Sequence, residues 1–208
     1  GEHAEWQGHH IDLLRKGEDP YIDVASEFYG ERIYKPAKDD PRKAAMEAIT
    51  KMQCSLFDKN YTIVRPHNVF GEGQALFDIK RNVVAIFMNR IMRKEPLIVF
   101  GDGNQRRAFS YIGDSLPAYL ACLDHADNET VNVGGAVTWS INQIVDMVKE
   151  AMGMPDVGVQ YVRQRYGEVQ NAWTTTTRSA AFLGYRDTIG VPEGIRRMAA
   201  WAKECGPQ

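Results

Sequence analysis

Two adjacent arginines, Arg106 and Arg107, follow a glycine-containing turn in the stretch FGDGNQRRAFSYIGD (100–114). A guanidinium group matches phosphate oxygens in pairs, and a glycine turn lets backbone amides come close to a ligand. Adjacent residues on a strand point to opposite faces, so the two arginines cannot both face one ligand. The stretch indicates a phosphate site that uses one arginine, against the commoner alternative of a solvated hairpin with surface arginines.

The stretch RPHNVFGEGQ (65–74) follows directly on YTIVRP (61–66), which is expected to be a buried strand that ends at its proline. Ligands of α/β proteins gather at the carboxyl ends of parallel strands, where His67 and Asn68 would then lie. The alternative is a plain turn in which Asn68 hydrogen-bonds the backbone. A third stretch, RQRYGEV (163–169), places Arg165 beside another glycine and is a weak signal when taken alone.

The elements that must position these residues alternate between helices and strands. Apolar spacing and glycine or proline boundaries predict helices over 8–17, 41–57, 82–94, 114–126 and 140–153, and a last helix from Pro192. They predict strands over 21–25, 61–66, 96–100, 108–112, 130–133 and 159–162. Asp40 and Asp114 are expected to cap the helices that follow them, and Ser140 forms a capping box with Gln143. This order predicts an α/β fold with a largely parallel sheet.

The composition excludes several classes of function. The 208 residues are 44% hydrophobic and 25% charged, which is typical of a globular protein. Lys and Arg total 25 against 27 Asp and Glu, so a net charge of -2 gives no electrostatic case for a nucleic-acid partner. No apolar run approaches the roughly 18 residues of a membrane span, and the polar N-terminus is not a signal peptide. Three widely spaced cysteines, Cys54, Cys122 and Cys205, favour a cytoplasmic protein without a disulfide framework or metal site.

Taken together, these stretches resemble one family. RPHNVFGEGQ, RNVVAIFMNRIMRKEPLIVFGDGNQRRAFSYIGD, TVNVGG, RYGEV and GIRRMAAWAKE match, in order and spacing, the C-terminal part of NAD(P)-dependent nucleotide-sugar epimerases and dehydratases, which are extended short-chain dehydrogenase/reductases. The resemblance covers residues 61–203. It implies a partial Rossmann-like sheet that binds NAD or NADP and a smaller C-terminal α/β part that binds a nucleoside-diphosphate sugar. The stretch RNVVAIFMNRI favours a UDP-sugar.

The resemblance also implies roles for individual residues. Asn68 and Arg107 would contact the sugar diphosphate, and Arg165 would support the diphosphate or the ribose. Gln105 and the backbone of Phe100 and Gly101 would hold the nucleoside. The chain then divides into residues 1–68, a remnant of the dinucleotide-binding part, and residues 69–208, the nucleotide-sugar part with segments that return to the Rossmann sheet.

The N-terminal residues match this family poorly. Gly8 corresponds to the last glycine of the dinucleotide-binding loop, but Glu2 and Glu5 stand where the loop has its other glycines. Carboxylates at those positions would repel a pyrophosphate. The resemblance therefore implies a truncated or degenerate Rossmann half in which dinucleotide binding is weak or absent, and Ser26 is the only hydroxyl near the expected catalytic Ser/Thr position.

The family's catalytic tyrosine and lysine lie one helical turn apart. Tyr34 and Lys38 have this spacing, but Pro41 starts a new helix and leaves both of them in the preceding loop. Lys43 matches the family's lysine better, with Asp39 in place of its tyrosine, so the pair is interpreted as a remnant. The catalytic candidates are Lys43, Ser26 and Tyr34, of which Lys43 would also contact the cofactor.

Three functions stay open at this point. They are an active epimerase or dehydratase, or a fragment of one; a catalytically inactive nucleotide-sugar binding module; and a structural remnant that binds nothing. The resemblance further implies a weak homodimer at most, through the helix over 41–57.

Overall fold

The structure, a computed structural model, describes residues 42–78, 82–124, 128–166 and 168–207, apart from the side chains of residues 42–44. The chain forms two compact units, Gly1–Leu56 and Phe57–Gln208, and each is considered by itself. In the first unit the described element is helix α3 (Arg42–Leu56), which confirms the helix expected after Pro41. The predicted helix over 8–17 and the predicted strand over 21–25 lie outside the described residues.

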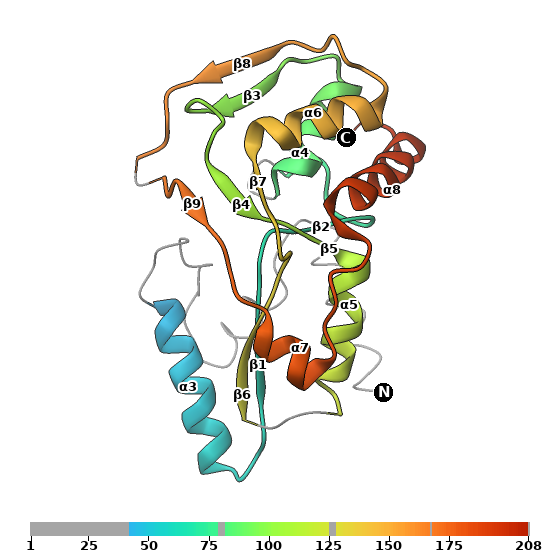
Figure 1. The fold of residues 1–208 in the computed structure, drawn as a ribbon. Helices are drawn as coiled ribbons and strands as arrows, with labels where there is room; N and C mark the ends of the chain where they lie inside the picture. Colours follow the sequence, from blue (N-terminus) through green and yellow to red (C-terminus); the bar gives the residue numbers. More distant parts are fainter. Residues whose placement is uncertain (1–41, 79–81, 125–127, 167, 208) are drawn as a thin grey trace, which may run out of the picture. The chain divides into compact units, whose positions relative to one another are not determined.

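The second unit alternates strands with helices, which confirms the predicted α/β class (Figure 1). Its elements are β1 (Thr62–Pro66), β2 (Val69–Phe70), α4 (Val83–Met92), β3 (Leu97–Phe100), β4 (Arg106–Ala108), β5 (Ser110–Tyr111), α5 (Ile112–Ala121), β6 (Glu129–Val133), β7 (Thr138–Ser140), α6 (Ile141–Met152), β8 (Val159–Val162), β9 (Asn171–Ala172), α7 (Thr177–Leu183) and α8 (Gly190–Cys205). This unit starts at Phe57, whereas the functional division expected from the sequence falls after residue 68.

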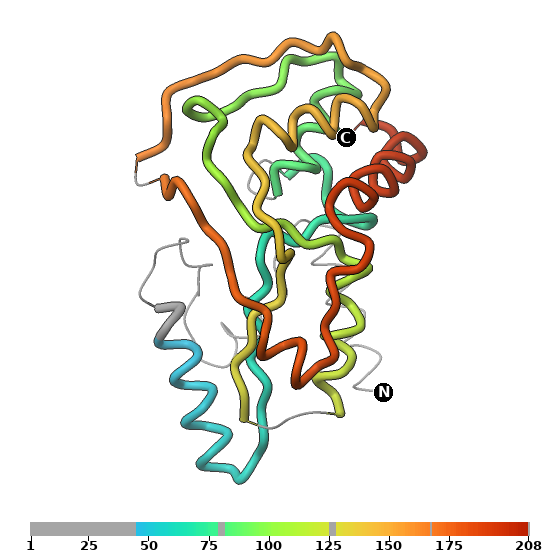
Figure 2. Tube along the Cα trace, in the orientation of Figure 1, coloured from blue at the N-terminus to red at the C-terminus, as the bar shows by residue number. Residues whose placement is uncertain are grey.

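The strands of the described residues form four short sheets rather than one. Strand β1 pairs with β6, β2 with β5 and β3 with β8, all in parallel. Strand β4 lies between β7, to which it is antiparallel, and β9, to which it is parallel. Figure 2 shows the traces of β1 and β6 running side by side although a long stretch of chain separates them. The prediction of a largely parallel arrangement is therefore confirmed.

Two details of the predicted strands are wrong. Strand β1 is half-buried to exposed rather than buried, because among the described residues β6 is its only partner. The single strand predicted over 108–112 is two strands, since Ala108 pairs with Thr138 while Ser110 pairs with Val69. The chain changes partner at Phe109, whose carbonyl oxygen lies where a Cβ at Gly135 would stand, 2.1 Å away.

Helices α4, α6 and α8 pack against one another around the larger hydrophobic core of this unit. Ile195, Met198 and Ala202 of α8 are fully buried, as the sequence predicted. The predicted capping box is also present: Ser140 Oγ accepts the N–H of Gln143, and Gln143 Oε1 accepts the N–H of Ser140. Helix α6 ends at Gly153 with φ of 72°, in the left-handed conformation that glycine adopts freely.

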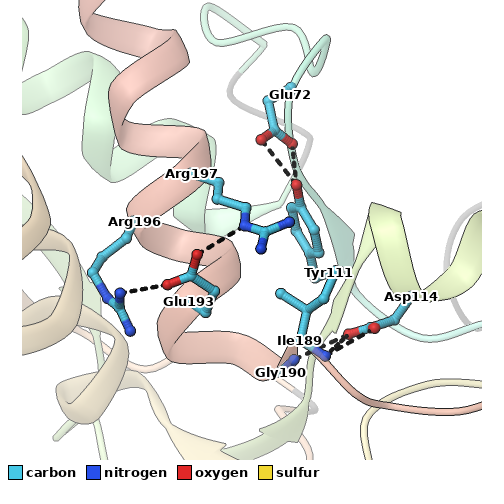
Figure 3. A network of polar contacts seen from close by, with 8 residues as sticks. All are labelled: Glu72, Tyr111, Asp114, Ile189, Gly190, Glu193, Arg196 and Arg197. Carbon is cyan, nitrogen blue, oxygen red and sulfur yellow. Dashed lines mark hydrogen bonds and ion pairs between the residues drawn. The ribbon is translucent and has the colours of Figure 1, made fainter.

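Asp114 has a different task from the one predicted. Helix α5 begins at Ile112 with Tyr111 as its N-cap residue, so Asp114 lies in the first turn instead of before it. Its carboxylate accepts the backbone N–H groups of Ile189 and Gly190 (Figure 3). It also accepts the backbone N–H of Thr188. Asp114 thus satisfies N–H groups at the start of α8, which have no acceptor within the helix itself. This helix begins at Gly190 and not at Pro192, where the sequence placed its start.

Tyr111 connects the loop after β2 to helix α8. Its ring is buried, and its hydroxyl donates to both carboxylate oxygens of Glu72, at 2.9 and 2.8 Å (Figure 3). The guanidinium carbon of Arg197 on α8 lies 5.9 Å from the centre of the ring, and Arg197 also pairs with Glu193. The loop after β2 is thereby attached to the β5–α8 packing through one side chain.

Candidate functional site

The turn after β3 is held in place by side chains at both of its ends. Asp102 Oδ1 accepts the N–H of Asn104 at 2.9 Å, and Asn142 of α6 donates to the carbonyl of Asp102 at 3.0 Å. Gly103 has φ of 74°, and an added Cβ would lie 2.0 Å from Asn142 Oδ1, so only glycine fits there. Gln105 is buried and donates to the carbonyl of Phe100 at 2.8 Å, which closes the turn.

The two arginines of β4 point to different neighbours, as the strand alternation predicted. Arg106 donates from Nε to Thr138 Oγ1 at 3.1 Å and from Nη2 to the carbonyl of Thr138 at 2.5 Å. It is half-buried, so the alternative of a solvated surface arginine does not hold for Arg106. Arg107 is 7% exposed and its Nη2 lies 2.6 Å from Glu168 Oε1. A buried guanidinium needs such a partner, and the sequence analysis did not identify it.

Asn68 lies just past the carboxyl end of β1, where the sequence placed it. Its φ of 40° is in the left-handed region, which asparagine tolerates better than most residues. Its side-chain nitrogen donates to the carbonyl of Ala108 at 2.7 Å, so the alternative of a backbone contact is also realised. That bond uses one of the two amide N–H groups of Asn68. The residue that accepts it, Ala108, directly follows Arg107 in the chain.

Asn82 supports this corner and was not singled out from the sequence. Its side-chain nitrogen donates to the carbonyls of Asn68 and Val69, at 2.8 and 3.2 Å, while its oxygen accepts the N–H of Val84 and caps α4. The signal that could have found it is an asparagine directly before the apolar run VVAIFM, a common N-cap position.

Arg165 lies over the aromatic ring of Phe100. Its guanidinium carbon is 3.8 Å from the ring centre, a close cation–π contact. The N–H of Glu168 donates to the carbonyl of Arg165 at 3.3 Å, which links this contact to the Arg107 ion pair. The structure thus connects Asn68, Gln105, Arg107 and Arg165 through the turn and strand β4, and we call this set, with Phe100 and Glu168, the arginine wall.

The arginine wall offers groups that bind anions and flat rings. Arg107 provides a buried guanidinium group, and the exposed Arg165 provides a second one, which lies over the ring of Phe100 beside the glycine turn. Asp102 stays charged, because the backbone N–H of Asn104 lowers the pKa of its carboxyl group.

Within the described residues there is no group of three or more His, Cys, Asp or Glu that could hold a metal ion. None of the described helices is both long and apolar enough to cross a membrane.

The catalytic candidates cannot be placed in the same way. Lys43 belongs to α3, with its side chain outside the described part of the structure. Gly8, Ser26 and Tyr34 all lie outside the described residues. Their roles stay predictions.

Comparisons with known proteins agree with this geometry. Residues 40–134 match the model of the NAD dependent epimerase/dehydratase family. A putative UDP-glucose 4-epimerase from Methanocaldococcus jannaschii is 32% identical over 208 aligned residues, which include 93% of this chain and 66% of that protein. The alignment therefore extends into the N-terminal residues that resemble the family least. The chain belongs to the NAD-dependent epimerase/dehydratase family.

Solved structures show the same relationship. The UDP-glucose 4-epimerase of Thermotoga maritima, determined with UDP-glucose, superposes with a TM-score of 0.75 and 27% identity, covering 84% of this chain and 56% of that one. The UDP-glucose 4-epimerase of Thermus thermophilus, determined with NAD, gives a TM-score of 0.70 and 27% identity, covering 83% of this chain and 58% of that one. The chain thus spans between about half and two thirds of the length of these relatives.

The described residues do not form a dinucleotide site by themselves. Such a site needs a glycine-rich turn that leads from a strand into a helix, whose N-terminus faces the pyrophosphate. The closely spaced glycines of the described residues lie in other settings: Gly71 and Gly73 follow β2, but α4 does not begin until Val83; Gly101 and Gly103 lead into β4; and Gly134 and Gly135 lead toward β7. The family's NAD is therefore not assigned to the described part of the chain.

Proposed function

We propose that residues 57–208 bind a nucleoside-diphosphate sugar, a UDP-sugar in the first instance, as the substrate-binding part of an NAD-dependent epimerase or dehydratase. The observation that carries the proposal is the arginine wall, in which residues from three separated stretches are connected by short contacts. A surface hairpin with unrelated arginines would not show these connections.

Each part of the ligand has a chemical counterpart in the wall. Arg107 and the amide of Asn68 suit the diphosphate oxygens, and Arg165 adds a second positive charge. The backbone of Phe100 and Gly101 suits the polar edge of a base. Gln105 holds the turn through the carbonyl of Phe100, and a direct contact from it to the nucleoside is part of this proposal.

The chemical step lies beyond the described residues. Within this proposal NAD or NADP would act with Lys43, and Ser26 and Tyr34 are the further catalytic candidates. A cytoplasmic location is also part of the proposal, and the resemblance and the three free cysteines support it. The main hypothesis is an epimerase or dehydratase. Asp39 in place of the family's tyrosine favours the second candidate, a nucleotide-sugar binding module without redox activity.

Calorimetric titration of UDP into the purified chain tests the proposed binding. We expect saturable binding of UDP and much weaker binding of uridine, because the arginines act on the phosphates. Equal binding of UDP and uridine, or no binding of UDP, would refute the proposal. Mass spectrometry of the purified protein, which detects copurified NAD or NADP, separates an enzyme from a binding module.

A further inference from the structure

Arg107 has most of its hydrogen-bonding capacity committed inside the protein. A guanidinium group has five N–H donors. Nη1 donates to the carbonyls of Arg106 and Gln170, at 2.8 and 3.2 Å, and Nη2 donates to Glu168 Oε1 at 2.6 Å. Among the described residues, these three bonds leave Nε–H and one N–H of Nη2 without a partner.

The three bonds fix the plane of the guanidinium at two points. The two carbonyls hold Nη1. Glu168 holds Nη2, and a rigid planar group anchored at both nitrogens has one orientation. Glu168 contacts Nη2 through one oxygen, Oε1, and so uses one of the two N–H donors of that nitrogen.

Glu168 is itself held by its surroundings. Its side chain is 19% exposed, and its N–H donates to the carbonyl of Arg165 at 3.3 Å. The nearby carbonyl of Gln170 accepts the N–H of Arg106 at 2.7 Å as well as Nη1 of Arg107, so this segment is fastened to β4 by main-chain and side-chain bonds together.

We propose that Glu168 is a positioning residue that orients Arg107 toward the diphosphate of the ligand. The inference rests on the proposed function, since the diphosphate is the group that the remaining N–H donors of Arg107 would bind. Glu168 acts through Arg107 and does not need to touch the ligand. Its carboxylate also compensates the buried positive charge when no ligand is bound.

The opposite role, in which Glu168 competes with the phosphates for Arg107, predicts the opposite result. A positioning residue is needed for binding, so Glu168→Ala should weaken UDP binding. A competitor blocks binding, so its removal should strengthen UDP binding. Glu168→Gln keeps an acceptor oxygen for Nη2 and removes the charge, so it should behave like the wild type if orientation is what matters.

The test is calorimetric titration of UDP into the wild type, Glu168→Ala and Glu168→Gln, and into Arg107→Ala with and without Glu168→Ala. We expect Glu168→Ala to bind about tenfold more weakly, the equivalent of one hydrogen bond to a charged group. Glu168→Gln should stay within about threefold of the wild type, and Glu168→Ala should have no further effect in the Arg107→Ala background. A merely structural role would weaken binding in that background too.

Glu129→Ala, which breaks the more exposed ion pair with Arg178, is the matched control and should leave UDP binding unchanged. Melting curves of all variants exclude unfolding as the cause of a loss. Tighter binding by Glu168→Ala, or unchanged binding, would overturn the positioning role while the proposed function stands. Failure of the wild type to bind UDP would overturn both.

Discussion

The carboxylate Oδ2 of Asp114 accepts a hydrogen bond from the backbone N–H of Gly190 across 3.0 Å, and so joins the first turn of α5 to the first turn of α8 (Figure 3). The same carboxylate accepts the N–H and hydroxyl of Thr188 and the N–H of Ile189. One buried side chain therefore satisfies the donors of a helix start that lies far away in the sequence.

Asp114→Asn should lower the free energy of unfolding by about 2–3 kcal/mol, because the amide presents a donor where N–H groups need an acceptor. Urea denaturation measures this change. Glu193→Gln is the control, since it breaks only surface ion pairs of the same helix and should shift the midpoint far less. A midpoint for Asp114→Asn equal to that of the control would contradict the capping role.

Asp187 makes the stability of this unit depend on pH. Burial raises the pKa of its carboxyl group, and the neighbouring carboxylate of Asp114 raises it further, against the effect of the Ala136 N–H. One of its oxygens, Oδ1, is buried and has no hydrogen-bond donor within the described part of the chain. The folded protein therefore holds this proton more tightly than the unfolded chain does.

It follows that Asp187 favours folding most at low pH, and that this contribution falls as the pH rises from the ordinary pKa of aspartate through the raised value. Asp187→Asn should be more stable than the wild type at pH 7, because the amide is uncharged and can donate to Asp114. The advantage should shrink toward pH 4. Urea midpoints of both proteins across this range test the sign, and a gap that widens on acidification would refute it.

Substitution of Arg106 should lower the stability, whereas substitution of Arg107 should weaken ligand binding. Arg107→Lys keeps the charge but loses the planar fork, so UDP should bind at least about tenfold more weakly. Arg106→Ala loses its bonds to Thr138 and should lower the free energy of unfolding by about 1 kcal/mol with little change in UDP affinity. If Arg106→Ala weakens UDP binding while Arg107→Lys does not, the assignment of the two faces of β4 is wrong.

Gly103→Ala should damage the turn of the arginine wall. The left-handed φ of 74° is expected to cost about 1–2 kcal/mol with alanine, and the clash with Asn142 Oδ1 adds to it. Gly153→Ala is a matched control, because φ there is 72° and an added Cβ meets nothing within 4 Å. The excess loss of stability in Gly103→Ala over Gly153→Ala measures the close contact, and UDP affinity should fall in Gly103→Ala alone.

The sequence predicted the elements that carry strong local signals. The capping box at Ser140, the glycine end of α6 and the apolar face of α8 depend on residues close together in the chain, and all are confirmed. Short strands without a strong apolar pattern, β7 and β9, and helix α7 were not predicted. Their formation depends on pairing with β4 and packing on α5, which local propensity does not encode.

The same distinction holds for the arginine wall. Arg107, Asn68 and Arg165 were found from residue types that suit phosphate, together with a family resemblance. Glu168 was missed because its partner lies across the fold, and the ion pair becomes visible only when β9 is placed beside β4. Asp114 was assigned to the wrong helix for the same reason, since the N–H groups that it caps are distant in sequence.

The ring of Tyr111 fills the space that side chains at two other positions would need. An added Cβ would lie 2.6 Å from the ring at Gly113 and 2.7 Å from it at Gly194. Neither glycine can therefore change first in the course of evolution while the tyrosine remains. The order of substitutions is imposed by packing: residue 111 must become smaller before either glycine position can accept a side chain, and that first step also deprives Glu72 of its hydroxyl donor.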